Sequence, residues 1–324
     1  MTFKTALLII SSLTCTSLGA QASGQDTKSG DTKPVDTKDM PVLGTPEKLH
    51  GGFEFTEGPT PDLEGNVYFT DIPTERILIH RPDGTLETFM TESGRCNGLM
   101  FDADGRLWAC QGGEGRLIRI DVKSKEITPV AARIDGGTFL STNDLVLDAH
   151  GGAYFTDPAY WRHADSKVDE GVYYVDSEGE ITRIAEKLLR PNGILLSPDG
   201  NTLYILPTGE QRLIAHPVLS PGKVGPGRDL AKLGSGGDGL TSDTEGNLYI
   251  TQPRRRCIDV YSPEGEKITS VQLRGSPSNI CFGGPKLDHL YVTAGSNFYR
   301  IPVNKNGLQP GAIGAGENKS QADD

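Results

Sequence analysis

A short strand pattern centred on an aromatic residue recurs six times along the chain at nearly even intervals. Each copy follows a turn that contains Asp, Gly or Asn. The six aromatic residues are Tyr68, Trp108, Tyr154, Tyr204, Tyr249 and Tyr291, and successive ones are 40, 46, 50, 45 and 42 residues apart. A unit of that length is typical of one four-stranded propeller blade. We therefore predict an all-β fold, a six-bladed β-propeller of four-stranded blades around a central channel. A two-sheet sandwich is the competing fold, but it does not explain a repeat near 45 residues.

The propeller is expected to span residues 43–308 as one domain. The whole chain has 41 Gly and 21 Pro, which suits a single all-β domain rich in turns. The last strand-like segment, Asn297 to Val303, precedes a Gly-rich polar tail, which we predict to be disordered over residues 309–324. The stretch Leu43 to His50 should then complete the sixth blade and remove free sheet edges.

The first 42 residues have the composition of an export signal and a spacer. Lys4 is the only charge in residues 1–22, Ala6 to Leu18 is apolar or small, and Ala20-Gln21-Ala22 fits a cleavage site. We predict a cleaved signal peptide at 1–22 and hence a periplasmic or extracellular protein, with an uncleaved anchor or a lipoprotein as alternatives. Residues 23–42 repeat Asp-Thr-Lys every five residues, and so polar a segment predicts a disordered linker.

Net charge and cysteine usage narrow the classes of partner. The formal charge is −11, which argues against nucleic acid and anionic membranes once the signal is removed. Four scattered cysteines, Cys96, Cys110, Cys257 and Cys281, contain no C-x-x-C pair, so a zinc site built on thiolates is not expected. Their disulfide state and the oligomeric state of the chain, monomeric or otherwise, stay open.

An amide or carboxyl side chain occupies the same place before each repeated aromatic. Counting back eleven or twelve residues gives Glu57, Asn97, Asn143, Asn192, Asp238 and Asn279. The first strand of a propeller blade lines the channel, so these six should form a ring around one axis. Converging oxygen donors without Cys or His suit a hard cation such as Ca²⁺, with Zn²⁺ or Mg²⁺ as alternatives. The competing reading is a wet channel lined by hydrogen-bonded amides.

Several short segments resemble one known family. They are Glu57-Gly58-Pro59-Thr60, Asn143-Asp144, Phe155-Thr156-Asp157-Pro158, Arg190-Pro191-Asn192-Gly193, Gly237-Asp238-Gly239 and Cys281-Phe282-Gly283-Gly284, in order over roughly residues 50–295. Together they resemble the family of senescence marker protein (regucalcin), gluconolactonase and luciferin-regenerating enzyme, with diisopropyl fluorophosphatase as a more distant relative. The resemblance implies a six-bladed propeller that holds one divalent metal.

The resemblance also implies roles for individual residues. It makes Glu57, Asn192 and Asp238 metal ligands, and Asn143 a fourth ligand or a substrate contact. Asp238 would also take and return the proton, whereas Asp144 is more commonly a strand-end residue. Sugar-lactone members often have an Arg two residues before the Asn, where this chain has Ser141. The stretch Thr156-Asp157-Pro158-Ala159-Tyr160 looks more like the bacterial gluconolactonase-like branch.

We therefore expect a metal-dependent lactonase, a hydrolase that opens a small lactone while a channel metal polarises its carbonyl. Asn97, Asn143, Asn279 and Tyr160 are the predicted substrate contacts. Two alternatives stay open: hydrolysis of a phosphotriester or aryl ester on the same site, and a non-catalytic ligand-binding propeller with structural calcium.

Overall fold

The computed structural model describes residues 40–314 with the exception of residue 161. Met1–Asp39 form a separate unit, so the predicted signal peptide and residues 23–39 of the predicted linker lie outside the described residues. The same holds for residues 315–324 of the predicted tail. The described part is all-β, and its helical elements are three single 3₁₀ turns. They are η2 (Gly112–Glu114), η3 (Thr208–Glu210) and η4 (Pro253–Arg255).

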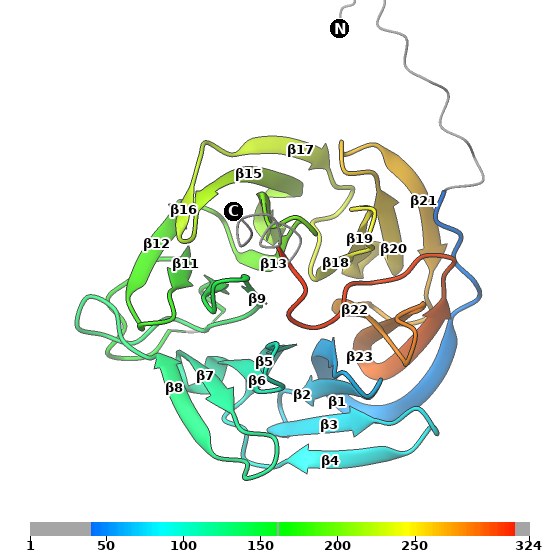
Figure 1. Cartoon of the computed structure of the whole chain (residues 1–324), viewed down its shortest axis with the longest axis horizontal. Coiled ribbons are helices and arrows are strands. Elements are labelled where there is room, and N and C mark those ends of the chain that lie inside the picture. Colours follow the sequence, from blue (N-terminus) through cyan, green and yellow to red (C-terminus); the bar gives the residue numbers. More distant parts are fainter. Residues whose placement is uncertain (1–39, 161, 315–324) are drawn as a thin grey trace, which may run out of the picture. The chain divides into compact units, whose positions relative to one another are not determined.

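The strands form five antiparallel sheets around a central axis (Figure 1). One sheet contains β5 (Cys96–Phe101), β6 (Leu107–Gln111), β7 (Arg116–Ile120) and β8 (Ile127–Ala131). A second contains β9 (Leu145–Leu147), β10 (Ala153–Asp157), β11 (Gly171–Val175) and β12 (Ile181–Glu186). A third contains β13 (Pro191–Leu196), β14 (Thr202–Pro207), β15 (Arg212–Ser220), β16 (Lys223–Val224) and β17 (Arg228–Lys232). A fourth contains β18 (Leu240–Ser242), β19 (Leu248–Gln252), β20 (Cys257–Tyr261) and β21 (Lys267–Gln272).

The fifth sheet has six strands and unites the first and last repeats. Its order is β22 (Asn279–Gly283), β23 (His289–Pro302), β1 (Glu47–Pro61), β2 (Val67–Asp71), β3 (Arg76–His80) and β4 (Leu86–Met90). The prediction of six separate blades is therefore wrong, because the structure has five sheets. The cause is the length of β1, which pairs with β23 near Glu47 and with β2 near Pro61. One continuous strand thus joins two repeats by hydrogen bonds.

The ring closes between the N-terminal and C-terminal strands, as the sequence predicted. Glu47 pairs with Arg300 across β1 and β23, and an isolated bridge joins Leu43 to Val303. Met40 and Val42, which we assigned to the linker from the sequence, both contact the propeller. Asn304 accepts a hydrogen bond from the backbone N–H of Val42 and donates one to the carbonyl of Met40. Chain closure removes free edges that would otherwise invite pairing with other chains.

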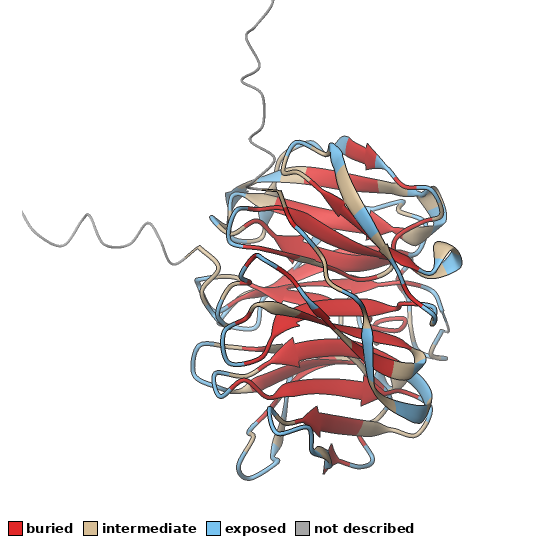
Figure 2. Ribbon diagram, turned by 90° about the vertical axis from the view of Figure 1, so that its right-hand side faces the viewer, coloured by how far each residue is buried: buried red, intermediate tan, exposed pale blue. Residues whose placement is uncertain are grey.

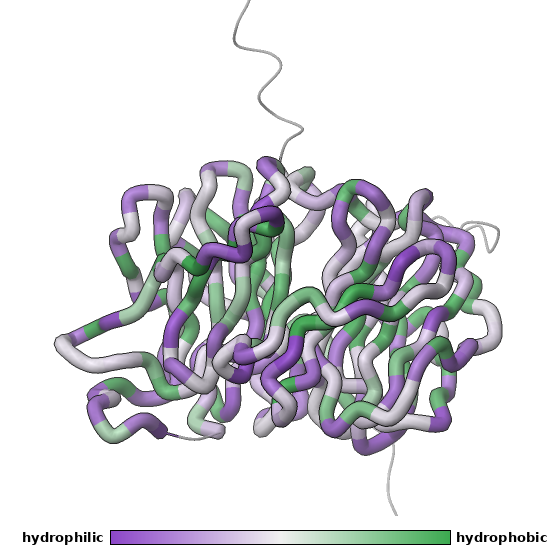
Figure 3. The backbone as a smooth tube through the Cα atoms, turned by 90° about the horizontal axis from the view of Figure 1, so that it is seen from below, coloured by the Kyte–Doolittle hydropathy of each residue, from purple (hydrophilic) through white to green (hydrophobic). Residues whose placement is uncertain are grey.

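Six inner strands surround the axis, and each contacts the next in the order β1, β5, β9, β13, β18 and β22, with β22 returning to β1. The repeated aromatic residues lie on the second strand of each repeat and are buried. Tyr68, for example, packs against Leu99 and Phe101 of the neighbouring sheet. Figures 2 and 3 show the result, with buried strand interiors and exposed polar turns. Burial of each such side chain stabilises the contact between sheets by about 2 kcal/mol.

Two further properties bear on function. Cys96, Cys110, Cys257 and Cys281 are all buried and free of disulfides. Within residues 40–314, no helix has the length and apolar character needed to cross a membrane.

Candidate functional site

Five of the six predicted ring residues lie within two residues of the start of an inner strand, and Glu57 lies within β1. Hydrogen bonds between neighbouring sheets hold their backbones. A threonine two residues after the repeated aromatic is buried in four repeats, at Thr70, Thr156, Thr251 and Thr293. The Thr70 hydroxyl donates to the carbonyl of Asn97 (3.2 Å), and the Thr156 hydroxyl donates to that of Asn192 (2.8 Å). These bonds run from one sheet to the next, so they fix the height of the ring residues along the axis.

The residue after each ring residue is glycine in four of the six repeats, at positions 58, 98, 193 and 239. A Cβ atom at Gly58 would lie 2.1 Å from the carbonyl oxygen of Asn97, and one at Gly193 would lie 2.4 Å from that of Asp238. Only a residue without a side chain permits so close an approach of neighbouring strands. The Gly193 N–H then donates to the Asp238 carbonyl at 2.9 Å.

Three carboxyl groups meet at this level of the axis. Burial raises the pKa of Glu57 well above its usual range, and the neighbouring charges of Asp238 and Asp144 raise it further. The pKa of Asp238 is raised for the same reasons, by burial first and then by Asp144. Burial raises the pKa of Asp144 to about 7. The charges that act on Glu57 and Asp238 are thus other carboxylates, and this destabilises all three as anions.

Two ring asparagines link the carboxyl groups to their surroundings. The Asn279 amide donates to the Asp144 carboxylate at 3.4 Å and also lowers the pKa of Glu57 through a hydrogen bond. The Asn192 amide lowers the pKa of Asp238 in the same way and donates to the Tyr160 hydroxyl at 2.7 Å. Because the Asn192 amide uses its N–H groups in these bonds, its oxygen stays available as an acceptor or ligand. Asn279 uses its own oxygen for the N–H of Ile280 (2.8 Å).

The structure therefore brings together five of the seven predicted site residues, Glu57, Asn192, Asp238, Asn279 and Tyr160, through the interactions above. Asn97 lies on β5, and Asn143 lies two residues before the start of β9. The Gly98 N–H donates to the carbonyl of Asn143 at 2.8 Å, which holds the two segments side by side. Asn143 is buried and Asn97 half-buried.

Asp144 belongs to the cluster, although the sequence favoured a strand-end role for it. Its carboxylate accepts from the Leu145 N–H at 3.0 Å and lies so near β5 that a Cβ on Gly98 would be 2.6 Å from it. A signal was present in the sequence. The position after the ring residue is glycine in four repeats and Ile280 in a fifth, so a carboxylate there departs from a packing pattern.

Other buried or partly buried polar residues near the axis and the closing sheet hold the fold together. Asp157 is buried and accepts from the N–H groups of Leu140 (2.9 Å) and Ser141 (2.7 Å), so it holds the loop before Asn143. His50 and His80 form a hydrogen-bonded pair (2.9 Å) beside Phe298 in the closing sheet.

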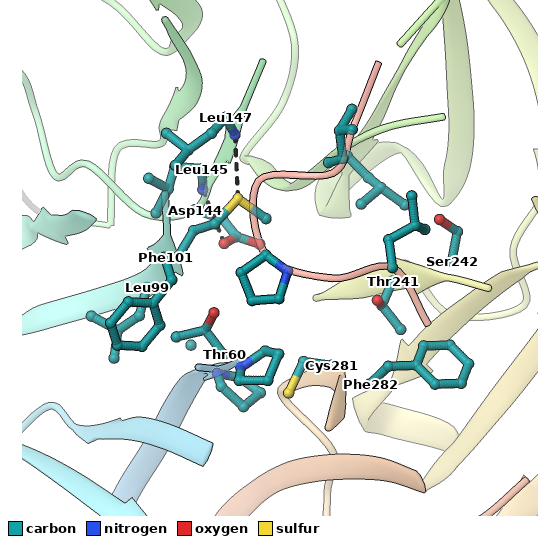
Figure 4. A pocket seen from close by; sticks show the side chains of 18 of the residues that line it. Thr60, Leu99, Phe101, Asp144, Leu145, Leu147, Thr241, Ser242, Cys281 and Phe282 are labelled. Atoms are coloured by element: carbon teal, nitrogen blue, oxygen red, sulfur yellow. Dashed lines mark hydrogen bonds between the residues drawn. The ribbon is translucent and has the colours of Figure 1, made fainter. Parts of the chain in front are cut away.

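A pocket of about 110 Å³ lies on the axis beneath the ring (Figure 4). Asp144 and Asn279 form part of its lining, and apolar side chains such as Leu99, Phe101 and Phe282 form much of the rest. The C-terminal strap, which we define as residues 304–314, covers its other side with Leu308, Pro310 and Ile313. Residues 309–314, which we assigned to the tail from the sequence, include several that line this pocket, namely Gln309, Pro310, Gly311 and Ile313.

The donor set suits a hard cation better than a soft one. Within the described residues, no group of three or more His, Cys, Asp and Glu side chains has a geometry for a metal ion. The cluster instead combines carboxylates with amide oxygens, which are the groups that Ca²⁺ accepts. Buried carboxylates that repel one another are stabilised by a bound cation.

Comparison with known proteins gives a family and a fold. The family described as SMP-30/Gluconolactonase/LRE-like region matches residues 55–296. The chain is 28% identical over 294 residues to the gluconolactonase of Zymomonas mobilis, which covers 80% of this chain and 82% of that protein. It is 28% identical over 231 residues to lactonase drp35 of Staphylococcus saprophyticus, with 68% and 70% covered.

The fold of this chain is also similar to those of solved structures. A gluconolactonase from Xanthomonas campestris superposes with a TM-score of 0.75 at 25% identity, over 80% of this chain and 89% of that one. The calcium-binding protein regucalcin from Agrobacterium tumefaciens gives a TM-score of 0.71 at 20% identity, over 82% and 96%. At that identity, the second likeness supports the β-propeller fold alone.

Proposed function

The chain belongs to the SMP-30/gluconolactonase/LRE-like family, and on that premise we propose that it hydrolyses a small lactone with the help of one divalent cation, Ca²⁺, at the ring. The observation that carries the proposal is the meeting of Glu57, Asp144 and Asp238 on the axis, where the charges that act on them are other carboxylates. The relatives named gluconolactonase and lactonase support the reaction class.

Glu57, Asn143, Asn192 and Asp238 are the residues we propose as ligands. They offer two carboxylates and two amide oxygens, a set that matches the preference of Ca²⁺. A bound divalent cation would polarise the lactone carbonyl and favour ionisation of water. Zn²⁺ and Mg²⁺ are the alternatives that a metal titration separates from Ca²⁺.

We assign proton transfer to Asp238. A carboxylate bound to a cation is a weak base, so the contribution of Asp238 would rest on its position beside the attacking water. A hydrogen bond with Asn192 orients the carboxylate. Asp238 would accept the proton from the attacking water and return it to the ring oxygen as that oxygen leaves. The product is then a hydroxy acid. The substrate contacts that we propose are Tyr160, Asn97, Asn143 and Asn279. The hydrogen bond that the Tyr160 hydroxyl accepts from Asn192 supports the first of them.

Replacement of Asp238 by Asn tests both the site and the reaction. We expect kcat to fall by about two orders of magnitude or more on a lactone substrate, because general base catalysis typically contributes that much. Asp104→Asn is the matched control, since Asp104 is an exposed turn residue. Turnover that survives D238N while metal is retained would contradict the proposed role of Asp238. A wild-type protein that holds metal and a ligand but turns over no lactone would favour a binding protein with structural calcium.

Chelation gives a second test of the metal. Treatment with EDTA should abolish lactonase activity, and added Ca²⁺ should restore it. Full activity in EDTA, from protein in which analysis finds no bound metal, would overturn the proposed metal requirement. Parallel assays on phosphotriesters and aryl esters decide whether the same site prefers another class of ester.

We also propose that the protein is exported after removal of residues 1–22. The composition of that segment supports this proposal. N-terminal sequencing of the exported protein should give Ser23 as the first residue, and an intact Met1 in the exported fraction would contradict it.

A further inference from the structure

Exposed hydrophobic side chains occur on segments that adjoin the ring. Six large hydrophobic side chains are exposed among the described residues, and three of them, Phe55 (43%), Tyr160 (43%) and Leu189 (53%), lie on segments that adjoin the ring. The other three are Val42, Leu63 and Leu219. Exposed apolar side chains that gather beside a site commonly mark what the site binds.

Each of the three side chains is close in sequence to a ring residue or is hydrogen-bonded to one. Phe55 precedes Glu57 by two positions on β1, so the two side chains share one side of the strand. The Tyr160 hydroxyl accepts from Asn192, which leaves the aromatic ring exposed at the mouth. Leu189 precedes Asn192 by three residues and lies so close to η3 that a Cβ on Gly209 would be 2.4 Å from its Cγ atom.

The acidic side chains around the same mouth are already bonded to the protein. Asp71 accepts hydrogen bonds from the N–H groups of Glu54 and Phe55, and Asp157 accepts from those of Leu140 and Ser141. Glu170 accepts from the N–H groups of Ala159 and Arg190. Glu210 accepts from the Leu189 N–H and from the Arg212 guanidinium. A sugar-derived lactone carries several hydroxyl groups that need partners once water is removed. Each of these carboxylates therefore already spends at least two of its about four acceptor sites on the protein itself.

The place where sugar-lactone members of the family have an arginine is filled differently here. Ser141 is buried, and its N–H donates to Asp157 at 2.7 Å. Arg95 and Arg190 stand at the equivalent places before Asn97 and Asn192 and are exposed. They can offer donors but no acceptors, so they replace only half of what a polyol needs.

From this arrangement we propose that the substrate is a lactone with an apolar alkyl or aryl substituent, rather than a polyhydroxylated aldonolactone. The substituent lies against Phe55, Tyr160 and Leu189 while the carbonyl faces the ring. The inference rests on the proposed lactonase function. Hydrolysis adds water across the ester bond: oxygen from water joins the carbonyl carbon, the bond from that carbon to the ring oxygen breaks, and the ring oxygen takes a proton.

Three lactones with the same six-membered ring test the proposal. δ-Valerolactone has no substituent, δ-octalactone carries a propyl group, and glucono-δ-lactone carries hydroxyl groups. With the Ca²⁺-loaded full-length protein, kcat/KM should be about tenfold higher for δ-octalactone than for δ-valerolactone, because each buried methylene group adds to binding. The gain should appear mainly in KM. Acid release, corrected for spontaneous hydrolysis, measures all three.

Variants at the mouth locate the effect. Leu189→Ser should lower kcat/KM for δ-octalactone by about threefold to tenfold and leave δ-valerolactone unchanged. Leu219→Ser is the matched control, since Leu219 is equally exposed (61%) on β15, outside the ring segments. Phe55→Ser provides a second, independent variant, and melting temperatures verify folding.

Two outcomes separate this inference from the function on which it rests. If glucono-δ-lactone is the best of the three substrates, or if Leu189→Ser and Leu219→Ser act alike on δ-octalactone, the apolar substituent is refuted and the lactonase function stands. If the metal-loaded protein hydrolyses none of the three, the lactonase function itself fails.

Discussion

The two ends of the axial channel are built from the same inner strands, yet they differ in chemistry. At the ring end, Glu57, Asp144 and Asp238 meet, and their pKa values are raised by burial. Further along the same strands, Leu99, Leu145 and Leu240 line the pocket that the strap covers (Figure 4). At the ring end, buried carboxyl groups lower the stability of the fold. At the strap end, buried apolar side chains raise it.

The strap explains how the far end stays closed. The Gly307 N–H donates to the carbonyl of Leu287 (2.8 Å), and the Gly314 N–H donates to that of Pro198 (3.1 Å). Figure 1 shows this C-terminal segment crossing the centre of the propeller from β23. Apolar contacts supply much of the cover, and the inner strands add the neutral hydroxyl side chains of Thr60, Thr241 and Ser242 at this end.

The largest effect is expected at the ring end. Glu57→Gln should reduce kcat/KM by about a thousandfold, or about 4 kcal/mol, because it removes a charge from the proposed metal site. Glu64→Gln, in an exposed turn, is the control. Activity and bound metal are measured together, and a variant that keeps both would show that Glu57 is not a required ligand and that the ring end does not carry the proposed function through it.

Added Ca²⁺ should stabilise the protein through the ring alone. At a hundred times its dissociation constant, a ligand that binds only the folded state adds about 2.7 kcal/mol to the free energy of unfolding. We expect this gain in the wild type and in strap variants but not in Glu57→Gln. Calorimetry with and without Ca²⁺ measures the change in the free energy of unfolding. An equal increase in Glu57→Gln would show that the cation binds away from Glu57.

At the strap end, Gly307→Ala should lower the free energy of unfolding by about 1–3 kcal/mol and leave kcat unchanged. The added Cβ would lie 2.2 Å from Cβ of Phe282, and overpacking in a filled region has that typical cost. Gly234→Ala is the control, because its nearest neighbours are atoms of the Arg255 side chain at 3.2 Å or more. Denaturant unfolding checks both, and a loss of activity without a loss of stability would couple the two ends.

The smallest effect concerns the ion pair that anchors the strap. Lys305 is 8% exposed and lies 2.6 Å from Glu245, which is 55% exposed. Glu245→Gln should cost about 0.5–1 kcal/mol, since one partner remains in solvent. The cost should shrink in high salt. A cost that does not change with salt would indicate packing rather than charge.

Much of the fold could be predicted because its repeat is local. Each copy carries its own turn, aromatic residue and ring side chain within about a dozen residues. Glu57, Asn192 and Asp238 could therefore be placed at equivalent positions without coordinates. The number of sheets could not, because the pairing of β1 with both β23 and β2 joins residues far apart in the chain.

The sequence by itself determined the repeat, and with it the side chains that face the axis, since a strand alternates its faces with a fixed period. Only the tertiary structure decided that Asp144 joins the ring and that the strap covers the pocket. Both depend on close approaches between distant segments, at Gly98 beside Asp144 and at Gly311, where a Cβ would lie 2.7 Å from Ala103. Such contacts follow from how sheets pack in three dimensions, which no local pattern encodes.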